Sequence, residues 1–177
     1  MRKSIAIVLA AFVASLLGVA YAPDMAAALP QAPKAKTGHI GDTLRLRGSD
    51  MTLNIVKATV TKKVRLRQAG LFGVHLVVRN VSTFYDEYWE SYPDYEEYFP
   101  KSVAVFDTKG KKYVAVRKAT DENGARLPNQ LGKVLLAKGE SCDGWIYFAL
   151  KPDRWAKTFR FRPNYGMGYD TGKWLLK

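Results

Sequence analysis

The chain has 177 residues, 47% hydrophobic and 25% charged, and its 28 Lys and Arg against 16 Asp and Glu give a formal net charge of +12. Its two histidines and single cysteine show no spacing typical of a zinc site, and one cysteine excludes an internal disulfide. There is no internal repeat, and the length is enough for one domain with its own core.

The N-terminus resembles a secretion signal. An uncharged apolar run at residues 5–22 follows Arg2 and Lys3, and a basic start, an apolar stretch and small residues at its end are typical of a signal peptide. Small residues precede possible cuts after Ala20 and after Ala28, whereas Pro23 disfavours a cut after Ala22. We predict a signal peptide at residues 1–28 and a secreted or envelope protein. An uncleaved membrane anchor is the alternative. A membrane span needs about 18 apolar residues or more, and the run at residues 5–22 is at this lower limit.

Residues 29–38 mix Pro, Ala and Lys without an apolar period, and we assign residues 29–42 to an extended tether. Cleavage after Ala28 removes Arg2, Lys3 and Asp24, so the net charge changes from +12 to +11. Outside the cytoplasm such a charge favours anionic wall polymers, acidic glycans, lipid headgroups or nucleic acid as partners. An equally good interpretation is that the excess Lys and Arg keep a secreted domain soluble.

From Thr43 onward the dominant hydrophobic period is two. Apolar residues alternate with arginines at residues 44–47, 64–67 and 159–162, and each segment predicts a strand with one apolar face and one arginine face. If the arginine faces are solvent-exposed, they form one or two basic patches for an anionic partner. The candidate contacts are Arg45, Arg47, Arg65, Arg67, Arg160 and Arg162.

The remaining pattern predicts a sheet protein. The parity of the apolar residues changes between Ile55 and Ala58, so we expect a β-bulge near Val56-Lys57. Further strands are predicted at residues 72–78, 101–106, 112–116, 134–136 and 145–150, with turns at 48–50, 107–110, 121–124 and 138–140. The predicted core is Val74, Leu76, Val78, Ile146, Phe148, Phe159 and Phe161. About eight short strands without a long helix predict an antiparallel β-sandwich or barrel at residues 43–163, followed by a C-terminal tail at 164–177.

Residues 84–99 (FYDEYWESYPDYEEYF) oppose the charge of the rest of the chain, with eight aromatic residues, six carboxylates and no Lys or Arg. The tyrosines recur at helical spacings, and Pro93 prevents one continuous helix, so we expect an insertion with short helical turns. Its rings would pack on the sandwich, or they would bind a glycan or a basic protein. A Ca²⁺ site at Asp86, Glu87 and Glu90 is a weaker alternative without EF-hand spacing. The aromatic candidate contacts are Tyr85, Tyr88, Trp89 and Tyr92.

Few residues carry reactive chemistry. His39 lies at the tether, and His75 has the parity of an outer-face strand residue. A hydrolytic triad needs His close to its partners in space, and neither Ser91 nor Ser141 has an obvious base. We therefore predict no catalytic residues, no cofactor and no metal site.

Cys142 is the single cysteine of a chain that we expect in an oxidising compartment. It shares the parity of Ile146 and Phe148, so we predict a buried free thiol that behaves as a small hydrophobic residue. An intermolecular disulfide or a reactive thiol is the alternative.

Four segments resemble a known family. Residues 74–82 (VHLVVRNVS) resemble a long strand ending on Asn, and residues 105–113 (VFDTKGKKY) resemble an Asp-x-x-Gly-Lys-x-Tyr hairpin. Residues 138–152 (KGESCDGWIYFALKP) resemble a Gly-Glu turn before an aromatic-rich strand, and residues 159–163 (FRFRP) the last strand. Together they are similar to domain of unknown function 4352, secreted or surface-anchored bacterial immunoglobulin-like sandwiches related to a mycobacterial immunoprotective extracellular antigen. The resemblance implies this fold and no catalytic residues, and residues 84–99 and 164–177 depart from it.

We expect a secreted, non-catalytic binding module at the bacterial cell envelope, with the arginine faces and the aromatic segment as contact surfaces. Its partner would be an anionic wall polymer, a glycan or another envelope protein, without specific nucleic-acid binding, and it would contact a membrane only through an uncleaved N-terminal segment. One alternative is a glycoside hydrolase that uses carboxylates of residues 86–97, since such enzymes need neither His nor a metal. Another is a purely structural wall-associated domain.

Overall fold

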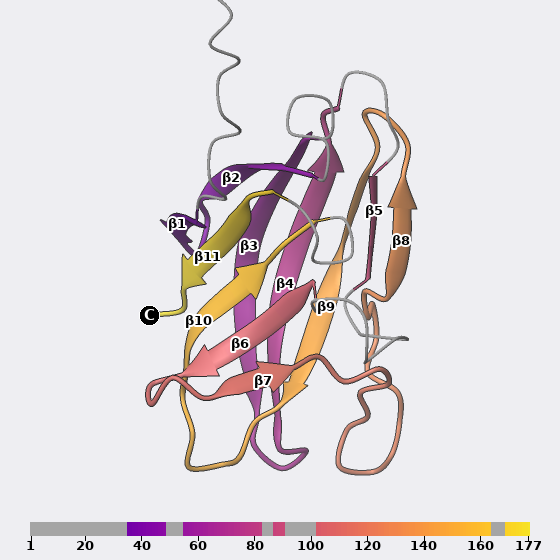
Figure 1. Ribbon diagram of the computed structural model, residues 1–177. Helices are drawn as coiled ribbons and strands as arrows, with labels where there is room; N and C mark the ends of the chain where they lie inside the picture. Colours follow the sequence, from indigo (N-terminus) through magenta and orange to yellow (C-terminus); the bar gives the residue numbers. More distant parts are fainter. Residues whose placement is uncertain (1–34, 49–54, 83–86, 91–101, 164–168) are drawn as a thin grey trace, which may run out of the picture. The chain divides into compact units, whose positions relative to one another are not determined.

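The computed structural model describes residues 35–48, 55–82, 87–90, 102–163 and 169–177 (Figure 1). The chain divides into two units, Met1–Gln31 and Ala32–Lys177, and every described residue belongs to the second. All regular elements among the described residues are β-strands, which confirms the predicted all-β fold. The predicted signal peptide lies outside the described residues.

Two sheets face each other across a shared core, as a β-sandwich (Figure 1). The first has the order β1 (Ala35–His39), β11 (Thr171–Leu175), β10 (Ala156–Phe161), β6 (Val103–Asp107) and β7 (Lys112–Val114). The second has the order β2 (Thr43–Arg47), β3 (Ile55–Leu66), β4 (Leu71–Asn80) and β9 (Ser141–Ala149). A separate ribbon pairs β5 (Glu87–Glu90) with β8 (Lys133–Leu136). The described residues thus form eleven strands, against about eight predicted, and the immunoglobulin-like assignment stays a prediction.

Alternate residues of the strands fill the space between the sheets. All seven predicted core residues are buried, with no more than 2% of their surface exposed. Phe148 of β9 meets Phe159 of β10 edge to face, with ring centroids 6.1 Å apart, so aromatic contact joins the two sheets. The apolar period of two therefore identified the core of β4, β9 and β10 correctly.

A β-bulge is present in β3, but not at the predicted position. Val56, Ala58 and Val60 are all fully buried, so the parity does not change near Val56-Lys57 and that prediction is wrong. The register with β4 shifts instead between Val60 and Lys62, which leaves Thr61 as the extra residue.

The bulge exchanges the two faces of the second half of β3. Beyond it, Lys63 and Arg65 lie opposite Val74 and Phe72, on the side of the core. Val64 faces away from the core and packs in a second apolar cluster on the outer side of the sheet. Leu66 packs in the same outer cluster. The prediction that the apolar residues of 64–67 face inward and the arginines outward is therefore wrong for Val64, Arg65 and Leu66.

The sheets use residues from both predicted flanking segments. Ala35–His39, within the predicted tether, forms β1 and pairs in parallel with β11. Thr171–Leu175, within the predicted tail, forms β11 between β1 and β10. Trp174 is fully buried, and its Nε1 donates a hydrogen bond to the carbonyl of Asp42 at 3.0 Å. Both strands are short and mostly polar, so their sequence pattern predicts a strand only weakly. Burial of Trp174 holds them against the core.

Part of the aromatic insertion is a strand, so the predicted helical turn is wrong for Glu87–Glu90. These residues form β5 and pair antiparallel with β8, from Glu87 opposite Leu136 to Glu90 opposite Lys133. Tyrosine and tryptophan also favour strands. The spacing of the tyrosines does not reveal that β8 supplies backbone hydrogen-bonding partners. Residues 84–86 and 91–99 lie outside the described residues.

Candidate functional site: the basic surfaces of the sandwich

The two arginines of β2 differ in their surroundings. Arg45 is exposed, whereas Arg47 donates hydrogen bonds to Asp170 from Nε at 3.0 Å and from Nη2 at 2.7 Å. The hydrogen bond to Asp170 raises the pKa of Arg47, against a smaller lowering by burial. Because Asp170 also binds Lys36 of β1 at 3.0 Å, Arg47 links the two sheets and is not an open contact residue.

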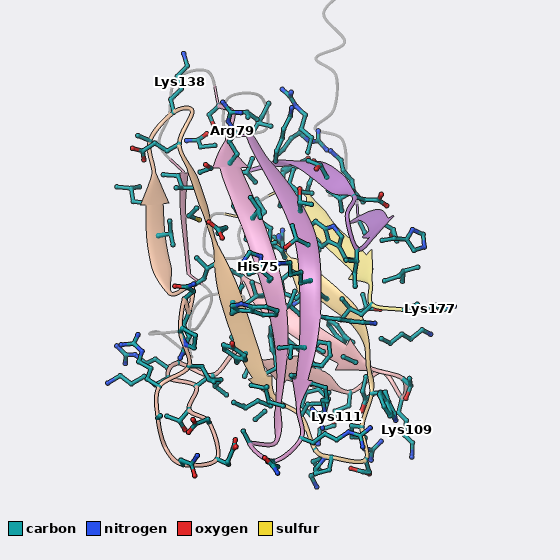
Figure 2. The ribbon with its side chains drawn as sticks, turned by 180° about the vertical axis from the view of Figure 1, so that it is seen from behind. His75, Arg79, Lys109, Lys111, Lys138 and Lys177 are labelled. Atoms are coloured by element: carbon teal, nitrogen blue, oxygen red, sulfur yellow. The ribbon has the colours of Figure 1, made fainter. Side chains whose placement is uncertain are left out.

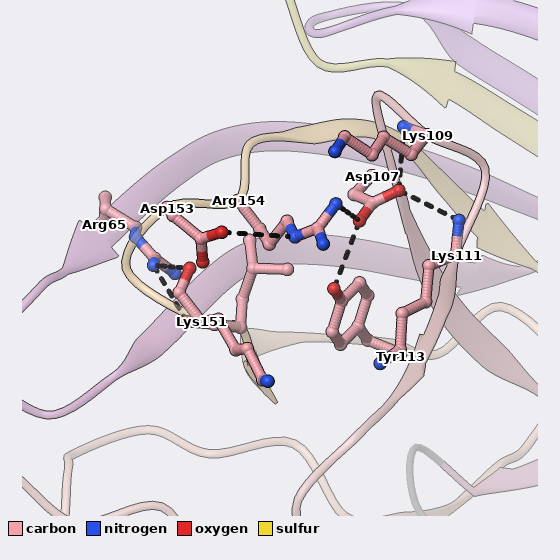
Figure 3. Close-up of polar contacts among 9 residues, drawn as sticks. Arg65, Asp107, Lys109, Lys111, Tyr113, Lys151, Asp153 and Arg154 are labelled. Atoms are coloured by element: carbon pink, nitrogen blue, oxygen red, sulfur yellow. Dashed lines mark hydrogen bonds and ion pairs between the residues drawn. The ribbon is translucent and has the colours of Figure 1, made fainter.

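Arg65 is also held by the fold. It donates hydrogen bonds to the carbonyls of Leu150 at 2.8 Å and Lys151 at 2.6 Å, in the connection from β9 to β10 (Figure 3). Burial and the nearby charge of Arg67 lower the pKa of Arg65. Arg67 itself is exposed, with its Cζ 5.7 Å from the ring centroid of Trp155. The expectation of two solvent-facing arginines is therefore met by Arg67 and wrong for Arg65.

Arg160 lies on the outward side of β10, where it is half-buried with its Cζ 5.4 Å from the ring centroid of Phe106. Burial and the charge of Arg162 lower the pKa of Arg160. Its cross-strand neighbour on β11 is Lys173, and neither residue pairs with a carboxylate within the described part of the chain. Together with Phe106 and Thr158 they line an open hollow of about 410 Å³.

We call this outward surface the β10 face. Phe106 lies opposite Lys112 of β7, and Arg162 follows Arg160 at the spacing that returns a side chain to the same face. The described residues of β6, β10 and β11 that point this way include no acidic residue. The members of the β10 face are Phe106, Lys112, Thr158, Arg160, Arg162 and Lys173.

The six predicted arginines therefore do not form one surface. Arg45 and Arg47 lie on β2, Arg65 near the end of β3 with Arg67 in the turn that follows, and Arg160 with Arg162 on the β10 face. Lys173 and Trp155 were missed, because their relevance depends on neighbours that are distant in sequence.

The aromatic candidates are only partly placed. Tyr88 and Trp89 belong to β5, but their side chains lie outside the description, as do Tyr85 and Tyr92. The predicted contact surface of residues 84–99, and the alternative sites that use its carboxylates, stay predictions.

His75 lies on the outer side of β4, as predicted (Figure 2). Its Nδ1 is 2.8 Å from Thr61 Oγ1, and its Nε2 is 3.3 Å from Asp143 Oδ2. The ring of Trp145 covers it edge-on, with centroids 5.1 Å apart. Thr61 is the extra residue of the bulge, so this polar cluster holds the bulge in place, and the sequence alone did not reveal the three partners.

Asp107 organises the end of the sandwich at the β6–β7 hairpin (Figure 3). It accepts hydrogen bonds from the backbone N–H groups of Lys109 and Lys111, both at 2.9 Å, and from Tyr113 Oη at 3.1 Å. Burial favours a raised pKa for Asp107, but these hydrogen bonds outweigh it and hold the pKa below its usual value. The Asp-x-x-Gly-Lys-x-Tyr segment therefore closes a hairpin, and Arg154 approaches the same carboxylate at 3.7 Å.

Cys142 is half-buried and packs against the core. Burial, together with the charge of Asp143, raises the pKa of its thiol to about 11. The thiol is therefore protonated at neutral pH, and a protonated thiol is a poor nucleophile.

Comparisons with known proteins add no further identification: no family model, no curated protein and no solved structure matches this chain. Among the described residues, no group of three or more His, Cys, Asp and Glu side chains is placed to hold a metal ion. No helix in that part of the chain is long and apolar enough to cross a membrane.

Proposed function

We propose that the protein is a secreted, non-catalytic binding module of the bacterial cell envelope, and that its β10 face holds an anionic polymer. The observation that carries this proposal is the cross-strand pair of Arg160 and Lys173. Like charges directly opposite each other on neighbouring strands destabilise a sheet. A bound anion offsets that repulsion. The pair does not stabilise the fold, so we attribute it to anion binding.

The chemistry of Arg160 supports an oxyanion as ligand. Its guanidinium is held against Phe106, and a planar fork of N–H donors matches a phosphate or carboxylate group. Its lowered pKa shows that the charged form is disfavoured by burial and by Arg162, so a nearby negative charge stabilises it. The signal-like N-terminus and the resemblance to secreted sandwiches support an extracytoplasmic location.

Binding to a polyanion column tests the proposal. The secreted chain should be retained on heparin or on a wall teichoic acid, and retention should weaken steeply with salt, because binding releases counterions. The double variant R160E/K173E should elute at much lower salt. Arg45→Glu changes an exposed arginine outside the β10 face, and it is the control matched in charge to the single variant Lys173→Glu.

A second measurement separates binding from folding. Lys173→Glu replaces a repulsive cross-strand pair by an attractive one, and should stabilise the protein by about 0.2–1 kcal/mol while it weakens polymer binding. Retention that ignores salt, or equal retention of R160E/K173E and the parent, contradicts the proposal.

A further inference from the structure

Trp155 is an exposed tryptophan in the turn that precedes β10. It leaves 60% of its surface exposed, although tryptophan is highly buried on average. Its side chain forms one wall of a hollow of about 200 Å³, which Phe72 and Ala156 also line. Such a ring beside a preformed hollow is typical of a ligand contact.

The backbone around Trp155 is fixed, while its ring is exposed. The carbonyl of Trp155 accepts a hydrogen bond from Thr108 N at 3.1 Å, and Arg154 N donates to the carbonyl of Lys151 at 3.0 Å. Arg154 also approaches Asp107 at 3.7 Å and Asp153 at 3.5 Å (Figure 3). Because the turn is already ordered, a ligand on the ring does not have to order it, which favours affinity.

Arg154 at the wall of the hollow is paired with carboxylates, but Lys63 and Arg65, which also line it, are held by carbonyls. Lys63 Nζ donates to the carbonyl of Leu176 at 2.6 Å, and Arg65 donates to the carbonyls of Leu150 and Lys151. A carbonyl satisfies the N–H groups but leaves the full charge in place. The Arg67 guanidinium lies above the indole ring. Arg67 also lines a neighbouring hollow together with Glu122.

The same end of the sandwich carries further cations. Figure 2 shows Lys109 and Lys111 at the β6–β7 hairpin, which Asp107 closes next to Arg154. The charge around Trp155 therefore favours an anionic ligand, and the exposed indole favours one that presents a flat apolar surface.

We propose that Trp155, with Arg67 and Lys63, binds one acidic sugar residue of a polysaccharide. The C–H face of the pyranose ring lies on the indole, and its carboxylate faces the two cations. The hollow is smaller than the 300–1,000 Å³ typical of a pocket for a whole small molecule, which suits one ring of a chain that continues outside. Single-stranded nucleic acid instead stacks successive bases on several rings, and here one exposed tryptophan is found among the described residues.

The site is separate from the β10 face, since the two share no residue. NMR of the secreted chain resolves the indole N–H signals of its four tryptophans, and Trp155→Phe assigns the signal of Trp155. A hexasaccharide of galacturonic acid should shift that signal in a saturable way. In the R160E/K173E background, which removes binding at the β10 face, isothermal titration calorimetry measures the affinity. Trp155→Ala should weaken it about tenfold or more, Arg67→Gln should weaken it less, and Trp155→Phe should retain part of it.

Two comparisons decide the ligand class. A neutral hexasaccharide of N-acetylglucosamine and poly-L-glutamate should both leave the Trp155 signal unshifted, and equal shifts with either one overturn the acidic-sugar assignment. Unchanged affinity of Trp155→Ala for the oligogalacturonate overturns the site. R160E/K173E should keep the Trp155 response, so a failed β10 face and a failed Trp155 site give different results. Melting curves confirm that each variant is folded, which is expected because Trp155 and Arg67 are exposed.

Discussion

Replacement of Asp170 by Asn tests the ionic link between the two sheets. The Asp170 side chain is fully buried, and it binds Arg47 at 2.7 Å and Lys36 at 3.0 Å. Burial alone would raise the pKa of Asp170, but the hydrogen bonds from Arg47 and Lys36 outweigh it and lower the pKa from 3.8 to about 2. With a discount for water around the partly exposed Lys36, this shift corresponds to about 1–2 kcal/mol of unfolding free energy at neutral pH.

The sign of the pH dependence follows from the lowered pKa. The stabilisation is fully present above the unfolded pKa of about 4, and it is lost as the pH falls through the folded pKa of about 2. Asp170→Asn lacks the charge at every pH. We therefore expect the variant to be less stable by at least about 1–2 kcal/mol at pH 7, and this difference should shrink toward zero near pH 2.

Urea unfolding followed by circular dichroism at several pH values between 7 and 2 measures the difference. Asp153→Asn is the control, because Asp153 is exposed and lies 3.5 Å from Arg154, and its effect should stay below about 0.5 kcal/mol. A difference between parent and Asp170→Asn that stays constant with pH would refute the reasoning, as would equal stability at pH 7.

Two further variants test the packing. Phe148→Ala empties a fully buried position against Phe159 and should cost about 3–5 kcal/mol; an unchanged melting temperature would show that the contact between the sheets is misplaced. Gly172→Ala adds a Cβ 2.6 Å from the Trp174 ring and should destabilise by about 1–3 kcal/mol, whereas Thr171→Ala on the same strand should have little effect. Equal melting temperatures for the two β11 variants would contradict the close approach at Gly172.

Local periodicity predicts what depends on local geometry. In β4, β9 and residues 158–161 of β10 the side chains alternate without interruption, so parity alone assigns the buried face, and the buried Leu76, Ile146 and Phe161 confirm it. The same rule fails in β3, because a bulge depends on the register with β4 and not on β3 alone. Thr61 becomes the extra residue where its hydroxyl reaches His75 across the pair, and no pattern within residues 55–66 contains that information.

The ends of the domain were misassigned for a related reason. β1 pairs with β11, which also pairs with β10, although Ala35 and Thr171 are far apart in the chain. A short strand is stable only when its neighbours are in place. A polar five-residue segment therefore reads as a tether or a tail until the partner strand is known. The same holds for β5 and β8. Tyrosines spaced by three and four residues predict a helix only when no partner strand competes for the backbone hydrogen bonds.

The arginines show why the functional residues could not be ranked from the sequence. Arg47 binds Asp170, 123 residues away in the sequence, and Arg65 binds the carbonyl of Leu150, 85 residues away. These partners occupy guanidinium donors that the alternating pattern predicts to be free. Arg67 and Arg160 keep theirs, and each lies against an aromatic ring, Trp155 or Phe106. The positive charge available to a ligand is therefore that of side chains, such as Arg67 and Arg160, whose donors make no hydrogen bonds within the described fold. Apart from the exposed Arg45, it remains at the β10 face and around Trp155, and at these two places a substitution should change binding without unfolding the sandwich.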